Sequence, residues 1–116
     1  MPPYGITTTY ISGSGWSAAL PILERGSLIE ATTTDGEHYL LVAGYTYDTD
    51  GVGYVLVVDS SATSVYKRAD GELYKYDGTS TPGAKYTKNP GCTGMIYWLK
   101  FSDERRLALW TELSQS

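Results

Sequence analysis

Two side chains that each occur once in the sequence, His38 and Cys92, are of the types used in nucleophilic catalysis. A thiol becomes a strong nucleophile when an imidazole can take its proton. His38 opens the apolar run 38–44, and Cys92 stands between a Pro-Gly pair and the apolar run 95–99, where we expect a loop to pass into a helix. Backbone N–H groups at such a helix start would stabilise an oxyanion, and Gly94 would let a substrate approach closely.

A carboxylate to orient the imidazole is expected from the next strand. In a hairpin that turns near residues 48–49, pairing Leu40 with Val57 and Val42 with Val55 sets His38 opposite Asp59. Facing residues of an antiparallel pair share one face of the sheet. A carboxylate there would fix the imidazole tautomer and leave the other ring nitrogen for the thiol. We therefore predict a catalytic triad in which Cys92 is the nucleophile, His38 the base and Asp59 the orienting group.

Three further residues are candidate substrate contacts: Gly94, Trp16 and Tyr39. The triad has ordinary alternatives. A lone cysteine among apolar residues is often a small buried hydrophobe, and a histidine at a strand start is often solvated or hydrogen-bonded. Asp59 followed by two serines is also typical of a strand end. A register slip of one residue would move Asp59 to the opposite face and abolish the triad.

The segments that carry these residues resemble a known family. Arg25-Gly26-Ser27-Leu28-Ile29-Glu30 and the run 38–44 resemble the "G-D-L-I … H-x-x-x-Y-x-G" core of NlpC/P60-type papain-like hydrolases. The segment 91–99 is similar to their "D-C-S-G-[FL]-V" nucleophile helix, and the order of His before Cys resembles the circularly permuted, lecithin:retinol acyltransferase-like branch. The resemblance implies the same three roles for Cys92, His38 and Asp59. Ser27 stands where the family often has Asp, and Gly91 where it has Asp or Asn.

The composition of the chain argues against several classes of partner and cofactor. The formal net charge is -4 over 116 residues, so a nucleic-acid partner is not expected. One Cys excludes an internal disulfide, and one Cys with one His is too few ligands for a zinc site without carboxylates. Asp48, Asp50 and Gly51 lack the remaining ligands of a calcium loop. We therefore expect no metal and no cofactor.

The location of the protein is constrained by what the sequence lacks. The first residues have neither a basic region nor an apolar core, so we expect no signal peptide. No apolar run approaches the ~18 residues that span a bilayer. A cytoplasmic or virion-associated protein follows from these observations, and its oligomeric state stays open.

The predicted fold is a single domain over 1–116, of the α+β class and rich in strand. There are 11 Tyr beside one Phe, and tyrosine favours strands. We expect a mainly antiparallel sheet of about five or six strands, with a short helical turn at 16–20 limited by Pro21. The expected strands are 5–11, 27–33, 38–44 and 53–59, with an edge hairpin of 65–68 and 73–76 before a loop over 77–91.

The C-terminal part admits two structures. Ser102 as N-cap and the spacing of Leu107, Trp110 and Leu113 favour a C-terminal helical segment over 106–113. The alternative is a hairpin that turns at 102–105 and continues an all-β sandwich or barrel. Residues 95–101 fit either a helix or a strand.

Two classes of function follow. The first is a small papain-like cysteine hydrolase or acyltransferase that acts on an amide or ester bond of a peptide or other substrate. The second is a non-enzymatic Tyr-rich β domain, such as a virion or tail component or a module that binds a glycan or a protein partner through its tyrosines and Trp16. A third, an inhibitor or immunity-type protein, would use the acidic surface to cover a basic site.

Overall fold

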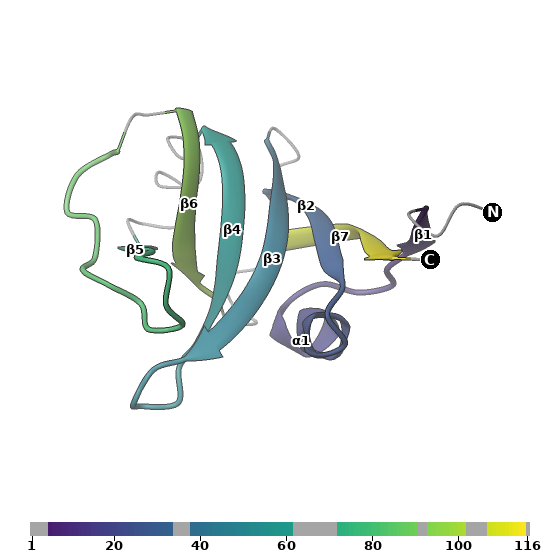
Figure 1. Cartoon of the computed structure of the whole chain (residues 1–116), viewed down its shortest axis with the longest axis horizontal. Helices are drawn as coiled ribbons and strands as arrows, with labels where there is room; N and C mark the ends of the chain where they lie inside the picture. Colours follow the sequence, from purple (N-terminus) through teal and green to yellow (C-terminus); the bar gives the residue numbers. More distant parts are fainter. Residues whose placement is uncertain (1–4, 34–37, 62–71, 91–92, 102–106, 116) are drawn as a thin grey trace.

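One open antiparallel sheet of seven strands forms the body of the protein (Figure 1). The computed structural model describes residues 5–33, 38–61, 72–90, 93–101 and 107–115. The spatial order of the strands is β1-β7-β2-β3-β4-β6-β5. The elements are β1 (Ile6–Tyr10), α1 (Trp16–Glu24), β2 (Leu28–Thr33), β3 (Tyr39–Tyr47), β4 (Gly53–Ser61), β5 (Leu73–Lys75), β6 (Thr93–Lys100) and β7 (Leu107–Gln115).

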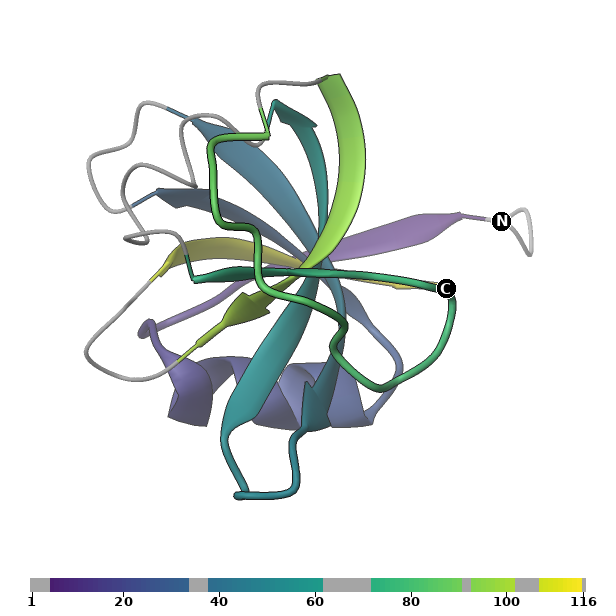
Figure 2. The ribbon, with the colours of Figure 1, turned by 90° about the vertical axis from the view of Figure 1, so that its left-hand side faces the viewer.

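The β-rich, mainly antiparallel class predicted from the sequence is confirmed. The strands fan out in a strong twist when the sheet is seen from its β5 end (Figure 2). Within the described residues they make one open sheet, and neither a closed barrel nor two stacked sheets is formed. Along β3 and β4, buried side chains such as Leu40, Val42, Val55 and Val57 alternate with less buried neighbours, so one face of the sheet carries the core. The fully buried members include Ile29, Val42, Val55, Val57 and Tyr97.

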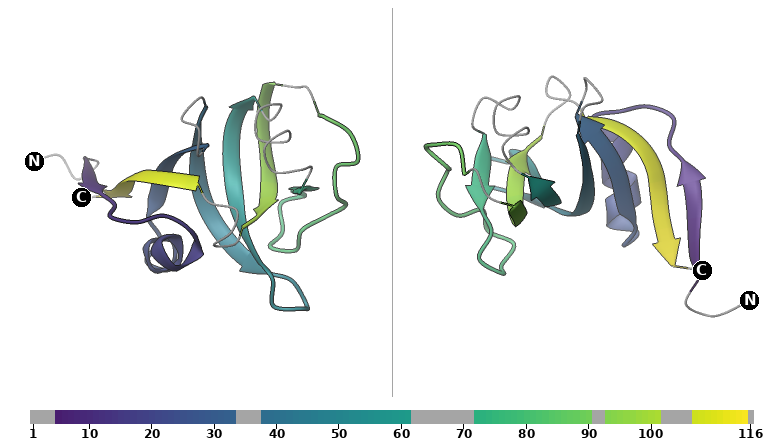
Figure 3. Two further views of the ribbon diagram at one scale, coloured as in Figure 1. Left: turned by 180° about the vertical axis from the view of Figure 1, so that it is seen from behind. Right: turned by 90° about the horizontal axis from the view of Figure 1, so that it is seen from above.

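The helix α1 packs against β2 and β3 and covers one face of the sheet (Figure 3). Its buried side chains are Ala19, Ile22 and Leu23. The helix continues through Pro21, so the expected limit at this residue is wrong. Its C-terminal end is tied to β7, because Arg25 pairs with Glu112 and Ser27 donates a hydrogen bond of 2.7 Å to the same carboxylate.

The predicted C-terminal helix is wrong, because the chain forms the strand β7 there. Leu107 and Leu109 are buried and Trp110 is 48% exposed, the period-2 pattern of a strand. β7 lies between β1 and β2, and this pairing on two sides supplies hydrogen bonds that outweigh the helical spacing of its apolar residues. The expected N-cap Ser102 lies outside the described residues.

The segment before β7 is also a strand, since residues 93–100 form β6 between β4 and β5. The predicted edge position of 73–76 agrees with β5, the last strand of the sheet. β5 pairs with β6. Its expected hairpin partner, residues 65–68, lies outside the described residues.

Candidate functional site

Neighbouring strands bring His38 and Asp59 together, although not in the register that we predicted. Val42 pairs with Val57 and not with Val55, so the true register differs by two residues at this point. The pairing also shifts between Val42 and Gly44, where the ladder is irregular. Because side chains alternate with a period of two, an error of two residues leaves each side chain on its predicted face. Asp59 therefore stays on the face that meets His38.

The two side chains are in direct contact. His38 Nε2 lies 2.5 Å from Asp59 Oδ1. The Asp59 side chain is fully buried, and 15% of the His38 side chain is exposed. The backbone holds the histidine as well, since Thr33 N–H donates a hydrogen bond to the His38 carbonyl at 3.0 Å. The contact leaves Nδ1 of the ring as the nitrogen that could exchange a proton with another group.

Two more donors fix the Asp59 carboxylate. Ser61 N–H donates to Oδ1 at 2.9 Å, and the Tyr97 hydroxyl donates to Oδ2 at 2.6 Å. Burial, and then the charge of Asp59, raise the pKa of Tyr97 far above its usual range, so its hydroxyl keeps its proton. A buried carboxylate is costly unless it is hydrogen-bonded. With donors on both oxygens, Asp59 is held in one orientation.

The predicted nucleophile, Cys92, lies outside the described residues. The next residue, Thr93, is in β6 and pairs with Ser61, two residues beyond Asp59 on β4. The helix that we expected to start near Cys92 is therefore wrong, and Gly94 lies in a strand. The oxyanion donors assigned to the first turn of that helix have no counterpart among residues 93–101.

The two aromatic residues predicted to contact substrate have different positions. Tyr39 follows His38 directly and is 63% exposed. Trp16 packs edge-on against Tyr45, Tyr47 and Phe101. Tyr45 lies seven residues beyond His38 along the chain, about 23 Å in a strand. Trp16 therefore packs near the far end of β3 from His38, and its role as a substrate contact stays a prediction.

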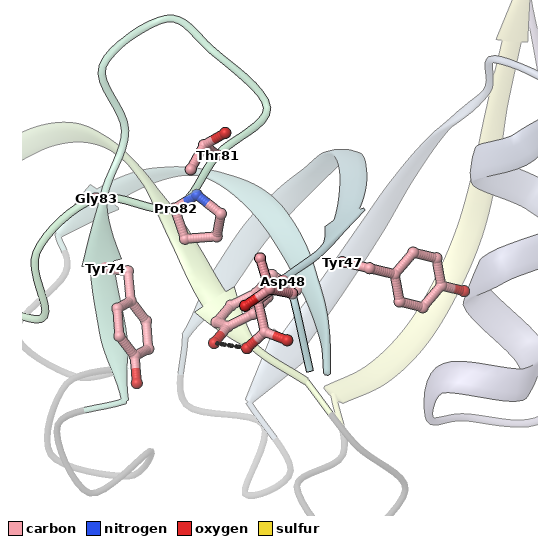
Figure 4. Close-up of a pocket in the computed structure, with 8 residues that line it drawn as sticks. Tyr47, Asp48, Tyr74, Thr81, Pro82 and Gly83 are labelled. Atoms are coloured by element: carbon pink, nitrogen blue, oxygen red, sulfur yellow. Dashed lines mark hydrogen bonds between the residues drawn. The ribbon is translucent and has the colours of Figure 1, made fainter. Parts of the chain in front are cut away.

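A cleft that the sequence analysis did not identify lies at the other end of β4 (Figure 4). It has a volume of about 400 Å³. Its lining residues are Tyr47, Asp48, Thr49, Tyr54, Tyr74, Thr81, Pro82 and Gly83. The sequence signal for it is the Asp48-to-Gly51 segment, which the sequence predicts as a hairpin turn and which lacks the ligands of a calcium loop. In the structure, Asp48 Oδ1 accepts the N–H groups of Asp50 and Val52, both at 2.9 Å.

The described part of the chain holds neither a candidate metal site nor a candidate membrane-spanning helix. No three His, Cys, Asp or Glu side chains among those residues are grouped so that they could hold a metal ion. No described helix is both long and apolar enough to cross a bilayer.

Comparison with protein-family models, with curated proteins and with solved structures finds no match to this chain. The function is therefore inferred from the geometry of this chain's own residues.

Proposed function

We propose that the protein is a small cysteine hydrolase or acyltransferase in which His38 and Asp59 activate Cys92. The observation that carries the proposal is the contact of 2.5 Å between His38 Nε2 and Asp59 Oδ1. A carboxylate that is itself fixed by Ser61 and Tyr97 holds the imidazole in one tautomer and one orientation. This is the arrangement that a general base requires.

The route of the chain supports the choice of nucleophile. β6 begins at Thr93, whose partner Ser61 donates its N–H to Asp59. Cys92 is covalently joined to Thr93, so the proposal requires the thiol to reach Nδ1 of His38 from that point. The other ring nitrogen is already occupied by Asp59.

The proposed reaction is acyl transfer through a thioester. The thiol proton of Cys92 passes to Nδ1 of His38, and the sulfur attacks the carbonyl carbon of an amide or ester. The tetrahedral intermediate expels the amine or alcohol, which takes the proton from His38. Water, or an acceptor alcohol or amine, then attacks the thioester, with His38 as base, and frees the thiol. Tyr39 is exposed and follows His38 in the chain, but strand alternation directs the two side chains to opposite faces, so Tyr39 is assigned no role in this reaction.

The test is the rate of Cys92 alkylation by iodoacetamide as a function of pH. An activated thiol reacts at pH values well below the ordinary thiol pKa of ~8.5. We expect the His38→Gln variant to react only as an ordinary thiol does, and Cys92→Ser to give no labelling. Tyr10→Phe, which is remote and exposed, is the matched control and should behave as the wild type.

An ordinary pH dependence in the wild-type protein would contradict the proposal, and so would an unchanged profile in His38→Gln. Circular dichroism of each variant separates loss of activation from loss of fold. Thioester formation with p-nitrophenyl acetate, detected by mass spectrometry, should likewise require both Cys92 and His38.

A second candidate function is a non-enzymatic, tyrosine-rich binding domain. The specific observation in its favour is the cleft at Tyr54 and Tyr74, which does not involve the His38 pair. If this candidate is right, the Cys92 thiol should react with iodoacetamide as an ordinary thiol does. The His38→Gln substitution should then leave that rate unchanged.

A further inference from the structure

The cleft lies between the β3–β4 turn, β5 and the loop that follows β5 (Figure 4). Tyr54 is five residues from Asp59 along β4, which corresponds to about 16 Å in a strand. The cleft is therefore separate from the His38–Asp59 pair. An inference about it goes beyond the proposed hydrolase and gives a ligand class to the second candidate function.

Two hydrogen bonds hold the outer wall of the cleft in place. The Thr46 hydroxyl donates to the Ser80 carbonyl at 2.6 Å, and Gly83 N–H donates to the Lys75 carbonyl at 2.8 Å. A Cβ atom at Gly83 would come within 2.9 Å of that same carbonyl oxygen, so only glycine permits this approach. The chain's own contacts thus hold this wall of the cleft in position, which lowers the entropy cost of binding.

Two tyrosine rings meet at a right angle in the cleft. The ring centroids of Tyr54 and Tyr74 are 5.3 Å apart, and the interplanar angle is 88°. Pro82 and Tyr74 lie on one side of Asp48, whereas the ring of Tyr47 points away toward α1 (Figure 4). The two rings are therefore in edge-to-face contact, and because Tyr54 is only 6% exposed, the aromatic face open to a ligand is that of the half-buried Tyr74. This face carries negative electrostatic potential, which attracts a cation.

A fixed negative charge lies beside these rings. The N–H of Val52 is the largest of several hydrogen bonds that hold the pKa of Asp48 below its ordinary value. Asp48 is therefore ionised at neutral pH. The Tyr54 hydroxyl donates its proton to Asp48 Oδ2 at 3.0 Å, which leaves the phenolic oxygen as an acceptor.

Among the described residues, the lining of the cleft includes one acidic side chain and no basic one. Lys100 exerts an electrostatic effect on Asp48, but its Nζ lies 3.7 Å from Glu72 Oε2, so this lysine is shared with a second carboxylate. The charge of the cleft is complementary to a cation. A neutral sugar could stack on the same rings and use the hydroxyls of Thr49 and Thr81, but it would gain nothing from the charge.

We infer that this cleft binds an alkylammonium group, such as a methylated amine, against the ring of Tyr74 and beside the Asp48 carboxylate. Tyr74 supplies cation–π attraction, Tyr54 supports its ring from behind, and Asp48 supplies the compensating charge. Pro82 closes the apolar side against the methyl groups.

The probe is choline, titrated against the full chain by nuclear magnetic resonance of the protein. Its neutral isostere, 3,3-dimethylbutan-1-ol, replaces the charged nitrogen by carbon at nearly equal shape. We expect saturable binding of choline with shifts at Tyr54 and Tyr74, and binding of the isostere that is about tenfold weaker. Methyl glucoside tests the sugar alternative.

Two variants test the assigned residues. Tyr74→Leu keeps apolar volume but removes the ring, and Asp48→Asn keeps an oxygen for the N–H groups of Asp50 and Val52 but removes the charge. Each should weaken choline binding about fivefold or more. Tyr10→Leu, whose residue is 87% exposed and outside the cleft, should leave it unchanged.

Equal affinity for choline and the isostere would overturn the inference, as would absence of saturable choline binding or preference for methyl glucoside. The rate of Cys92 alkylation is measured on the same variants. It should not change in Tyr74→Leu, so failure of this inference and failure of the proposed hydrolase can be distinguished.

Discussion

At the scale of single residues, the most constrained group is the carboxylate of Asp59. Three donors from different parts of the chain converge on it, namely His38, Ser61 and Tyr97. Asp59 is 2% exposed and Tyr97 is fully buried, so water does not replace a lost partner at Oδ2. The network therefore matters to stability whether or not His38 takes part in catalysis.

The Tyr97 hydroxyl offers a test of this network. Tyr97→Phe removes the donor to Asp59 Oδ2 with little change in volume. Because a buried acceptor is then left unsatisfied, we expect the free energy of unfolding to fall by about 1–3 kcal/mol. Urea denaturation measures this loss. Tyr39→Phe, at a residue that is 63% exposed, should change it by less than about 0.5 kcal/mol. Equal effects of the two substitutions would contradict the assigned role of Tyr97.

At the scale of elements, alternation within strands was predictable and the choice between helix and strand was not. The His38–Asp59 contact could be anticipated because the face of a residue depends only on its parity in the strand. The predicted register of β3 against β4 was wrong by two residues, since no sequence pattern indicates the irregularity between Val42 and Gly44. The cleft was missed because its walls come from β3, β4 and the loop after β5, whose meeting depends on tertiary packing.

The C-terminal error has a physical cause that can be tested. Spacing of three between Leu107, Trp110 and Leu113 suits a helix, but pairing with both β1 and β2 makes this segment an interior strand. A helix with that apolar face would bury Leu113 and leave Leu109 off the face. In the strand, Leu109 is 6% exposed and Leu113 is only half-buried.

The matched pair Leu109→Ala and Leu113→Ala separates these two structures. We expect Leu109→Ala to lower the free energy of unfolding by about 2–5 kcal/mol because it opens a cavity in the core. Leu113→Ala should cost about 1 kcal/mol, since less apolar surface is buried there. Chemical denaturation of both variants gives the comparison, and a larger loss for Leu113→Ala would favour the helix.

At the scale of the whole molecule, ionised carboxylates fasten three separate regions. Asp48 organises the β3–β4 turn, Asp77 accepts hydrogen bonds from Thr79 in the loop after β5, and Glu112 joins β7 to the end of α1. Hydrogen bonds lower the pKa of each: from Val52 N–H for Asp48, from the Thr79 hydroxyl for Asp77 and from Arg25 for Glu112. Acid should therefore loosen the molecule at three places at once.

The stability of the protein should depend on pH in a defined direction. A carboxyl group whose pKa is lower in the folded state contributes stability that is fully present above its unfolded pKa of about 4. That contribution is lost as the pH falls through the folded pKa. We expect the free energy of unfolding to be constant from about pH 8 to 5 as far as these groups are concerned, and to fall below about pH 4. Denaturation at a series of pH values measures the profile.

The Glu112→Gln variant isolates the contribution of one carboxyl group to the pH dependence of the free energy of unfolding. The glutamine keeps the size of the side chain but loses the charge that pairs with Arg25, whose side chain is 55% exposed. At pH 7 we expect the variant to be less stable than the wild type by about 1 kcal/mol, because an exposed partner limits the value of the pair. The difference should shrink as the pH falls through the folded pKa of Glu112, since the wild-type carboxyl then becomes neutral too. Glu30→Gln, at an exposed residue of β2, is the control, and a difference for Glu112→Gln that persists unchanged in acid would show that packing and not charge joins the helix to β7.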